Sequence, residues 1–207
     1  MNTTWTTIPT QEIIDQTATN LTKNGFNTII VASKEDAKAK VLELLPEGAE
    51  VMTMSSVTID SIGLFAAINS SGKYNAVKAK LMTMDRATQG REMQKLGAAP
   101  DYAVGSVNAV TQDGKVLIAS NTGSQIPAYA YAASHVIWVV GAQKIVKDVA
   151  EGETRINDYI LPLESKRLEK VFQLPDYKSN VSKLLIMSRE INPKRMTLIL
   201  VQEPLGF

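Results

Sequence analysis

The chain has 207 residues, a length that suits one domain and can bury a sizeable core. Its formal net charge of +1 gives no electrostatic argument for binding nucleic acid or an acidic membrane surface. With no cysteine and one histidine, it cannot form disulfides, thiolate nucleophiles or cysteine-ligated zinc or iron–sulfur sites, which leaves only oxygen-ligated cations such as Mg²⁺. The N-terminal segment is polar, and no apolar run approaches the roughly 20 residues that span a bilayer, so we expect a cytoplasmic protein.

The first half of the chain alternates apolar runs at helical spacing with short β-branched runs. Gly25 ends the first helix, and Ser33 with Asp36 forms a capping-box pattern before the second. The predicted elements are a helix over residues 10–24, a strand over 26–32, a helix over 34–45, a strand over 50–54, a helix over 59–69, and a polar helical section over 74–96 that breaks near 84–85.

The second half has three apolar segments separated by glycines and small polar residues. Asp113 and Gly114 form a hairpin-type turn between the first two segments. The predicted elements are strands over 102–110, 116–119, 136–140 and 196–202, a small-residue helix over 127–133, and an amphipathic segment over 150–159. From Pro162 onward the chain is charged and less regular until the last strand.

This alternation of strands and helices is typical of parallel βαβ units. We therefore predict the α/β class, with a Rossmann-like, mostly parallel sheet, helices on both faces and one antiparallel hairpin excursion. One domain should cover residues 1–207, with an N-terminal helix within 1–25 and a C-terminal segment, 163–207, that ends in a strand. A single sheet is expected to contain the strands that end near Ala32, Met54, Val104, Ala119, Val140 and Gln202.

Polar residues follow several of the predicted strands. In an open α/β sheet, ligands bind in the crevice beyond the carboxyl ends of the strands. The loop with Ser55, Ser56 and Thr58 could bind an anion through its hydroxyls and the amides of the following helix, or Ser56 or Thr58 could simply cap that helix. The loop over residues 120–124 lacks the spacing of a P-loop, and its composition also fits a plain turn. Its position favours binding, with Gly123 allowing close approach of a ligand.

Three other residues are weighed as candidates for the chemistry. Lys144 follows the 136–140 strand and could pair with a phosphate or carboxylate, although a surface lysine is commoner. Glu203 follows the last strand, and with Lys144 it is a candidate catalytic group; alternatively it is a surface charge. His135 lies at the strand end opposite the crevice, so we expect no catalytic role. The pairs Lys166-Arg167 and Lys194-Arg195 are expected on solvated faces.

The predicted ligand-binding set combines hydroxyls, amides, glycines and one lysine. Such groups suit a small anionic metabolite better than an apolar ligand, and no metal or other cofactor is expected. The set is Ser55, Ser56, Thr58, Gly105, Asn108, Asn121, Thr122, Gly123, Ser124 and Lys144.

Several motifs occur in a recognisable order. Residues 108–114 (NAVTQDG) match N-A-x-T-x-x-G, and residues 141–146 (GAQKIV) match G-x-x-K-I-V. Arg155, Pro162 and Arg167 match an R…P…R pattern, and residues 200–207 (LVQEPLGF) resemble a V-x-E-x-L-G-F ending. The chain thus resembles the LUD domain family, named for lactate utilisation, and within it proteins of the lactate utilisation protein C type. The loop over residues 121–126 departs from the G-N-R-V-like loop of that family.

The resemblance implies a fold like that of glucosamine-6-phosphate deaminase, ribose-5-phosphate isomerase and CoA transferases. It also implies an association with bacterial lactate oxidation, in which LUD proteins accompany iron–sulfur oxidoreductase subunits. Some relatives carry cluster-binding cysteines, and this chain has none, so any redox role would need a partner.

The function expected from these features is binding of a small anionic metabolite, accessory to lactate or related organic-acid oxidation, with iron–sulfur oxidoreductase subunits as partners. The alternatives are a stand-alone enzyme acting on a sugar phosphate or an acyl-CoA, and a non-catalytic scaffold subunit. The residues leave open whether the protein is an enzyme and whether it forms a homo-oligomer. Neither nucleic acid nor a membrane is expected as a partner.

Overall fold

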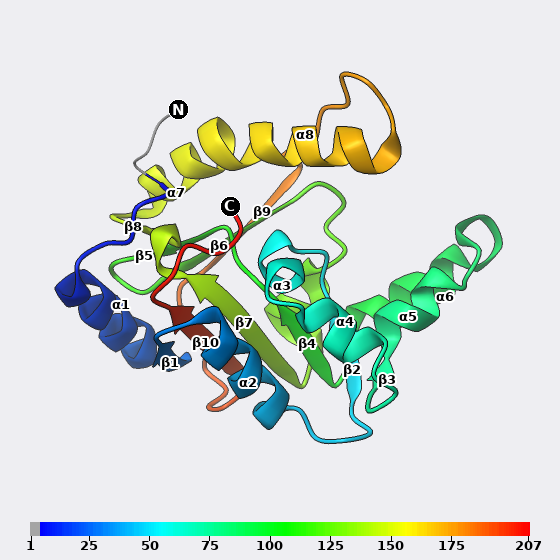
Figure 1. The fold of residues 1–207 in the computed structure, drawn as a ribbon, viewed down its shortest axis with the longest axis horizontal. Coiled ribbons are helices and arrows are strands. Elements are labelled where there is room, and N and C mark those ends of the chain that lie inside the picture. Colours follow the sequence, from blue (N-terminus) through cyan, green and yellow to red (C-terminus); the bar gives the residue numbers. More distant parts are fainter. Residues whose placement is uncertain (1–4) are drawn as a thin grey trace.

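The structure, a computed structural model, describes residues 5–207 and is built around two β-sheets (Figure 1). Residues 1–4 of the predicted N-terminal segment lie outside the described residues. The larger sheet is parallel throughout, and its strands in spatial order are β1 (Asn27–Val31), β10 (Met196–Val201), β7 (His135–Gly141), β4 (Tyr102–Gly105), β2 (Glu50–Thr53) and β3 (Asn75–Ala76). The smaller, mixed sheet contains β8 (Ile145–Val146), β5 (Ala109–Thr111), β6 (Val116–Ser120) and β9 (Lys183–Met187).

The helices lie around and between these sheets. None of those within residues 5–207 is both long and apolar enough to cross a bilayer. They are α1 (Gln11–Lys23), α2 (Lys34–Leu44), α3 (Val57–Ser61), α4 (Leu64–Asn69), α5 (Val77–Met82), α6 (Arg86–Ala98), η1 (Ala128–Ala132), η2 (Ala142–Lys144), α7 (Val149–Arg155), η3 (Ile156–Ile160) and α8 (Leu161–Phe172).

Alternate side chains of the central strands enter two cores, one on each face of the larger sheet. On β7, Trp138 and Val140 enter one core, and Ile137 and Val139 enter the other. The helices α2, α3 and α4 cover the second core, whereas α1, α5, η1 and one face of the smaller sheet cover the first. A third cluster joins η3 to the outer face of the smaller sheet. The predicted α/β class, with a mostly parallel sheet and helices on both faces, is confirmed.

The prediction of one sheet is wrong for the strand that ends near Ala119. That strand, β6, pairs antiparallel with β5 and β9 in the smaller sheet. The predicted strand over residues 102–110 is two strands, because the chain leaves the larger sheet after Gly105. The expected hairpin excursion at Asp113 and Gly114 exists, but it belongs to this second sheet.

The segment 163–207 is more regular than predicted. The backbone stays helical from η3 into α8, so Pro162 lies inside a continuous helical stretch, directly after the π-helical turn η3. α8 extends along the top of the molecule in Figure 1, and none of its residues is buried. β9 then forms the edge of the smaller sheet. The expected loss of regular structure from Pro162 onward is therefore wrong for residues 162–172.

Two predicted helices are interrupted in the structure. The helix over 59–69 splits into α3 and α4 at Gly63, whose φ is 69°. The section over 74–96 begins with the short strand β3, and its predicted break separates α5 from α6, where Asp85 caps the second helix. The capping box of Ser33 and Asp36 is confirmed at the start of α2.

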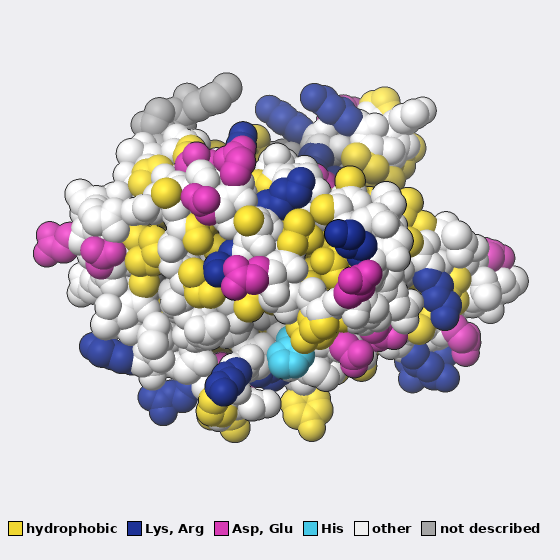
Figure 2. All heavy atoms as spheres, turned by 60° about the horizontal axis from the view of Figure 1, so that its bottom comes forward, with side chains coloured by type: hydrophobic (Ala, Val, Ile, Leu, Met, Phe, Trp, Pro, Cys, Tyr) yellow, Lys and Arg dark blue, Asp and Glu magenta, His cyan; other side chains and the backbone are white. Residues whose placement is uncertain are grey.

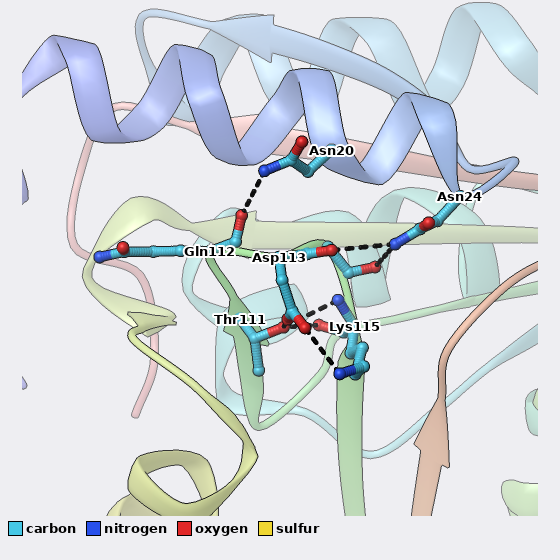
Figure 3. A network of polar contacts seen from close by, with 7 residues as sticks. Asn20, Asn24, Thr111, Gln112, Asp113 and Lys115 are labelled. Carbon is cyan, nitrogen blue, oxygen red and sulfur yellow. Dashed lines mark hydrogen bonds and ion pairs between the residues drawn. The ribbon is translucent and has the colours of Figure 1, made fainter.

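Polar contacts fasten α1 to the β5–β6 hairpin (Figure 3). Asn24 Nδ2 donates to the carbonyl oxygens of Asp113 and Gly114, at 3.0 and 2.9 Å. Asn20 Nδ2 donates to the carbonyl oxygen of Gln112 at 2.8 Å. Gly114 has a φ of 85°, and a Cβ there would lie 2.6 Å from the backbone carbonyl carbon of Asn20. The last glycine of the N-A-x-T-x-x-G motif is therefore explained by packing under α1.

Candidate functional site

A cavity of about 470 Å³ opens at the carboxyl ends of β2, β4 and β7. Its walls come from the loops after β2, β4 and β6, from η2, and from α8 with the segment 173–182 that follows it. Parallel strands bring their carboxyl ends to one edge of the sheet, which is why loops distant in sequence meet here. The volume lies within the range of roughly 300–1,000 Å³ that is usual for small-molecule sites.

Lys144 lies at the floor of this cavity, with 2% of its surface exposed. Its Nζ donates to Thr58 Oγ1 at 3.0 Å and to Ser106 Oγ at 3.1 Å. A third hydrogen bond reaches the carbonyl oxygen of Val107 at 3.2 Å. These acceptors use the three donors of an ammonium group, and none of them is a carboxylate. The surface-lysine alternative for Lys144 is therefore wrong.

The surroundings of Lys144 shift its pKa. Burial, together with the nearby Arg155 guanidinium, lowers the pKa of Lys144 to about 7. Desolvation disfavours the ammonium, and no opposite charge offsets that effect. Both the ammonium and the amine are consequently available near neutral pH, the first to pair with an anion and the second to accept a proton.

Arg155 supports the loop after β4. It is fully buried, and its Nη1 donates to the carbonyl oxygen of Asn108 at 2.6 Å. The guanidinium carbon lies 5.4 Å from the centre of the Tyr159 ring. Burial lowers the pKa of Arg155 to about 10. On the other side of the loop, Asn108 Oδ1 accepts from the backbone N–H of Ala119 at 2.7 Å, so Asn108 is held between the end of α7 and β6.

Lys78 and Arg86 line the mouth of the cavity. Lys78, on α5, is half-buried, and its Nζ donates to Ser55 Oγ at 3.2 Å. Burial lowers the pKa of Lys78, and the neighbouring Arg86 lowers it as well. Within residues 5–207 neither cation takes part in an ion pair. Their positive charges are thus without a directly bound carboxylate.

A fourth cation reaches the cavity from α8. Arg167 forms two hydrogen bonds with Glu164, both at 2.7 Å, which raise the pKa of Arg167. Asp60 lies close enough to Arg167 and Lys78 to be affected by both, although burial dominates and raises the pKa of Asp60. Among residues 5–207, the lining therefore contains four cationic side chains and one acidic side chain, Glu164.

The loop after β6 forms a further wall. Ser120 Oγ donates to Gln125 Oε1 at 2.9 Å and accepts from the backbone N–H of Gly123 at 2.8 Å. Asn121 Oδ1 accepts from Ser182 Oγ at 3.3 Å, which ties the loop to the segment after α8. Side-chain hydrogen bonds therefore shape the turn, while Asn121, Thr122 and Ser124 line the cavity.

Residues 14–201 match the family model of the LUD domain. This chain belongs to the LUD domain family. The matched range contains the whole of both sheets and every loop after β2, β4, β6 and β7 that lines the cavity. Among curated proteins, none matches the chain.

The LUD domain is also similar in fold to a solved structure. A DUF162 family protein from Deinococcus radiodurans gives a TM-score of 0.57 at 14% identity, over 93% of this chain and 99% of that one. At this identity the likeness supports the fold alone. A weaker likeness, to eIF2B beta from Chaetomium thermophilum, has a TM-score of 0.35 at 14% identity, over 58% of this chain and 45% of that one. That score does not bear on the fold.

The structure brings most of the predicted ligand-binding residues of this LUD domain together. Those that line the cavity are Ser55, Ser56, Thr58, Asn108, Asn121, Thr122, Ser124 and Lys144. Gly105 and Gly123 do not line it. A Cβ on Gly105 would overlap the Tyr129 hydroxyl, and one on Gly123 would lie 2.5 Å from Cδ of Lys183. Both glycines make room for neighbouring side chains, and ligand binding by the other residues stays a prediction.

The expected role of a helix N-terminus at the loop after β2 is not supported. The helix that follows, α3, spans only Val57–Ser61, and Ser56 makes no side-chain cap hydrogen bond to it. The Ser56 capping alternative is therefore wrong, and anion binding at this loop stays a prediction. Contacts with lysines place this loop instead, since Ser55 accepts from Lys78 and Thr58 accepts from Lys144.

Two other candidates lie away from the cavity lining. Glu203 Oε2 accepts from the backbone N–H of Lys34 at 3.1 Å, at the start of α2. His135 begins β7, at the opposite end of the sheet from the cavity, and its ring stacks on Tyr102 with centres 4.7 Å apart. The imidazole is exposed, on a face where Figure 2 shows side chains of both charges interspersed. The predicted position of His135 is confirmed.

Sequence reasoning missed Lys78, Arg86 and Arg167. The first two lie in the polar section over 74–96, which is typical of a solvated helix. Arg167 was expected on a solvated face with Lys166, but it lines the cavity. The only signal in the sequence was the presence of two cations in the connection after the Ser55 loop. That pattern does not identify a site unless the fold is known to bring this connection to the cavity. In the described part of the chain, no group of three or more histidine, aspartate or glutamate side chains could hold a metal ion.

Proposed function

We propose that this LUD-domain protein binds a small anionic metabolite in the cavity, in a role accessory to the oxidation of lactate or related organic acids. The observation that carries the proposal is the charge of the lining. The described side chains that line the cavity include four cations and one acidic group, Glu164; the cations are Lys78, Arg86, Lys144 and Arg167. Hydrogen bonds from cationic donors to a carboxylate or phosphate are about twice as strong as neutral ones, so an anion gains most from this lining.

Lys144 is the residue best placed to hold the anion at the floor. Its three present acceptors are two hydroxyls and a carbonyl, all neutral. A bound carboxylate would replace one of them and supply the counter-charge that the buried ammonium lacks. If the acceptor replaced is the hydroxyl of Thr58 or of Ser106, that hydroxyl could then turn to the same ligand.

The link with lactate oxidation is supported by membership of the LUD domain family. The chain has no cysteine, so cysteine ligands for an iron–sulfur cluster would have to come from another subunit. We include iron–sulfur oxidoreductase subunits as the proposed partners for that reason. A chain that binds an organic acid but has no cysteine ligands for an iron–sulfur cluster fits a subunit that holds or delivers that acid.

Calorimetric titration with L-lactate, pyruvate and inorganic phosphate tests the proposal, with thermal unfolding as a second readout. A ligand at a hundredfold excess over its Kd should stabilise the native state by about 2.7 kcal/mol. Lys144→Met, which keeps most of the apolar stem, should weaken binding by about tenfold or more because a charged hydrogen bond is lost. Lys147→Met is the matched control, since Lys147 is exposed and does not line the cavity. If none of the three anions binds, the scaffold alternative replaces this proposal.

A second candidate is a stand-alone enzyme acting on a sugar phosphate or an acyl-CoA. The observation that favours it is Lys144, because a buried amine with a pKa of about 7 is suited to proton transfer at neutral pH. Following candidate substrates by NMR with wild type and Lys144→Met tests it. Turnover lost in the variant supports the enzyme, and absence of turnover with intact binding excludes it.

A further inference from the structure

The cations at the mouth of the cavity are electrostatically unfavourable as they stand. Lys78 is half-buried beside Arg86, and desolvation and this like charge lower the pKa of Lys78 more than the nearby Asp60 raises it. The direct partner of Lys78 Nζ is a neutral hydroxyl, Ser55 Oγ, at 3.2 Å. Such an arrangement of like charges around a cavity is typical of binding sites, where the ligand supplies the missing charge.

We propose that Lys78 and Arg86, with the hydroxyls of Ser55 and Ser56, form a subsite for the phosphoryl group of a phosphate ester. The ligand of the cavity would thus be a phosphorylated organic acid. This inference rests on the proposed function, because it assumes that an anion occupies the cavity, and it names the chemical class of that anion.

The number of charges favours a phosphoryl group over a carboxylate at this subsite. A phosphate monoester carries a charge of about −1.5 to −2 near neutral pH and presents three acceptor oxygens. The two unpaired cations match that charge, and the Ser55 and Ser56 hydroxyls add donors next to them. A single carboxylate would leave one of the two cations without a partner.

Arg167 does not belong to this subsite, although it lines the same cavity. Both of its forked hydrogen bonds go to Glu164, so its charge is already compensated. Lys144 is separate as well, because it lies buried at the floor whereas Arg86 is exposed at the mouth. The cavity thus has two cationic positions at different depths, which fits a ligand with a phosphoryl group at one end and a carboxylate at the other.

A matched pair of probes tests the inference, namely L-lactate and its phosphate ester, 2-phospholactate. They share the carboxylate and differ in the phosphoryl group. Calorimetric titration at low ionic strength should give a Kd for the ester at least about tenfold lower than for lactate, as expected for an added charged hydrogen bond. The double variant Lys78→Met/Arg86→Gln should lose this preference. Lys80→Met/Arg91→Gln is the control, since both residues are exposed on the same two helices and do not line the cavity.

The outcomes separate this inference from the proposed function. Preference for the ester in wild type and in the control, lost in the double variant, supports the subsite. Equal affinity for both probes, or a preference that survives Lys78→Met/Arg86→Gln, overturns the subsite and leaves anion binding intact. If neither probe binds, the subsite is overturned, and the proposed function is overturned as well when pyruvate and phosphate also fail to bind. Circular dichroism and thermal unfolding establish that each variant is folded before the titrations are compared.

Discussion

The hydroxyl of Tyr129 fills the space that a Cβ atom of residue 105 would occupy. Gly105 is the last residue of β4, and Tyr129 comes from η1 on the first-core face of the larger sheet. The Tyr129 ring also meets Trp138 edge-on, with ring centres 5.3 Å apart. This glycine therefore sets how closely η1 packs on the sheet beneath the cavity, which is why a residue predicted to bind ligand serves packing.

Gly105→Ala should destabilise the protein by about 2 kcal/mol or more, because the new methyl group overlaps a fully buried side chain. Urea denaturation measures the change. Tyr129→Phe in the same chain should recover part of the loss by removing the hydroxyl. Recovery should be incomplete, since Met54 Cβ would still lie at 3.1 Å from the added methyl. A Gly105→Ala variant as stable as wild type would contradict this account.

The structure also revises the role of Arg195. It was expected on a solvated face, but it is buried, with its Nη1 2.7 Å from Glu190 Oε2. Its remaining donors reach the carbonyl oxygens of Ala128, Tyr129 and Ala133 at 3.0–3.1 Å. Arg195 thus fixes the η1 segment to the start of β10.

Arg195→Met should lower the free energy of unfolding by about 3–5 kcal/mol, because Glu190 and three carbonyl groups lose their buried partner. The matched control is Lys194→Met, next in the chain and exposed, which should change stability by no more than about 0.5 kcal/mol. Chemical denaturation of the three proteins gives the comparison. Equal losses for the two variants would show that the buried contacts of Arg195 contribute nothing specific.

The junction between α1 and the β5–β6 hairpin can be tested separately. Asn24→Ala removes the two hydrogen bonds to Asp113 and Gly114, and should cost about 1–2 kcal/mol. Native-state hydrogen exchange should show faster exchange of the hairpin amide of Lys115, whose backbone N–H bonds Thr111 Oγ1. Thr19→Ala, exposed on the same helix, is the control. Unchanged protection of the hairpin amides in Asn24→Ala would mean that the hydrogen bonds of Asn24 are not needed to hold the hairpin in place.

Local signals in the sequence predicted many of the helices and strands, but not β3, β8, β9 or α8, and not which strands pair across the two sheets. Ser33 with Asp36 and Asp113 with Gly114 act within a few residues, so the capping box and the hairpin were predicted correctly. The partner of β6 was not, because β9 lies more than sixty residues further along and its run, Lys183–Met187, has an exposed face. Apolar strands of both sheets look alike, and only the path of the chain after Gly105 separates them.

Some residues of the candidate site could likewise be predicted from local sequence, and others could not. Hydroxyls and amides after predicted strands could be placed at one edge, because parallel strands share their carboxyl ends. Lys78 and Arg86 could not be placed there, because they lie in the middle of a helical connection. They reach the cavity only because α5 packs against β2 and α6 packs against α5. The burial of Lys144 was equally invisible, because a lysine after a strand has the same local pattern whether its side chain enters the core or the solvent.

The buried amine of Lys144 should make stability depend on pH in a predictable direction. The native state releases this proton near pH 7, whereas the unfolded chain keeps it up to the ordinary lysine value of 10.5. Between these values the unfolded state binds more protons, so stability should rise with pH. The free energy of unfolding of wild type should rise by about 2 kcal/mol relative to that of Lys144→Met between about pH 7 and pH 9, because each pKa unit corresponds to about 1.36 kcal/mol. Below about pH 7 the difference between the two proteins should be flat.

Urea unfolding of wild type and Lys144→Met across this pH range measures the difference, in which all other titrating groups cancel. Lys147→Met is the control for removal of a lysine side chain, because Lys147 is exposed and does not line the cavity. A constant difference for Lys144→Met would show that Lys144 stays an ammonium throughout. Its three hydrogen bonds would then stabilise the charged form against burial, which removes the basis for proton transfer by Lys144 and leaves anion binding as its role.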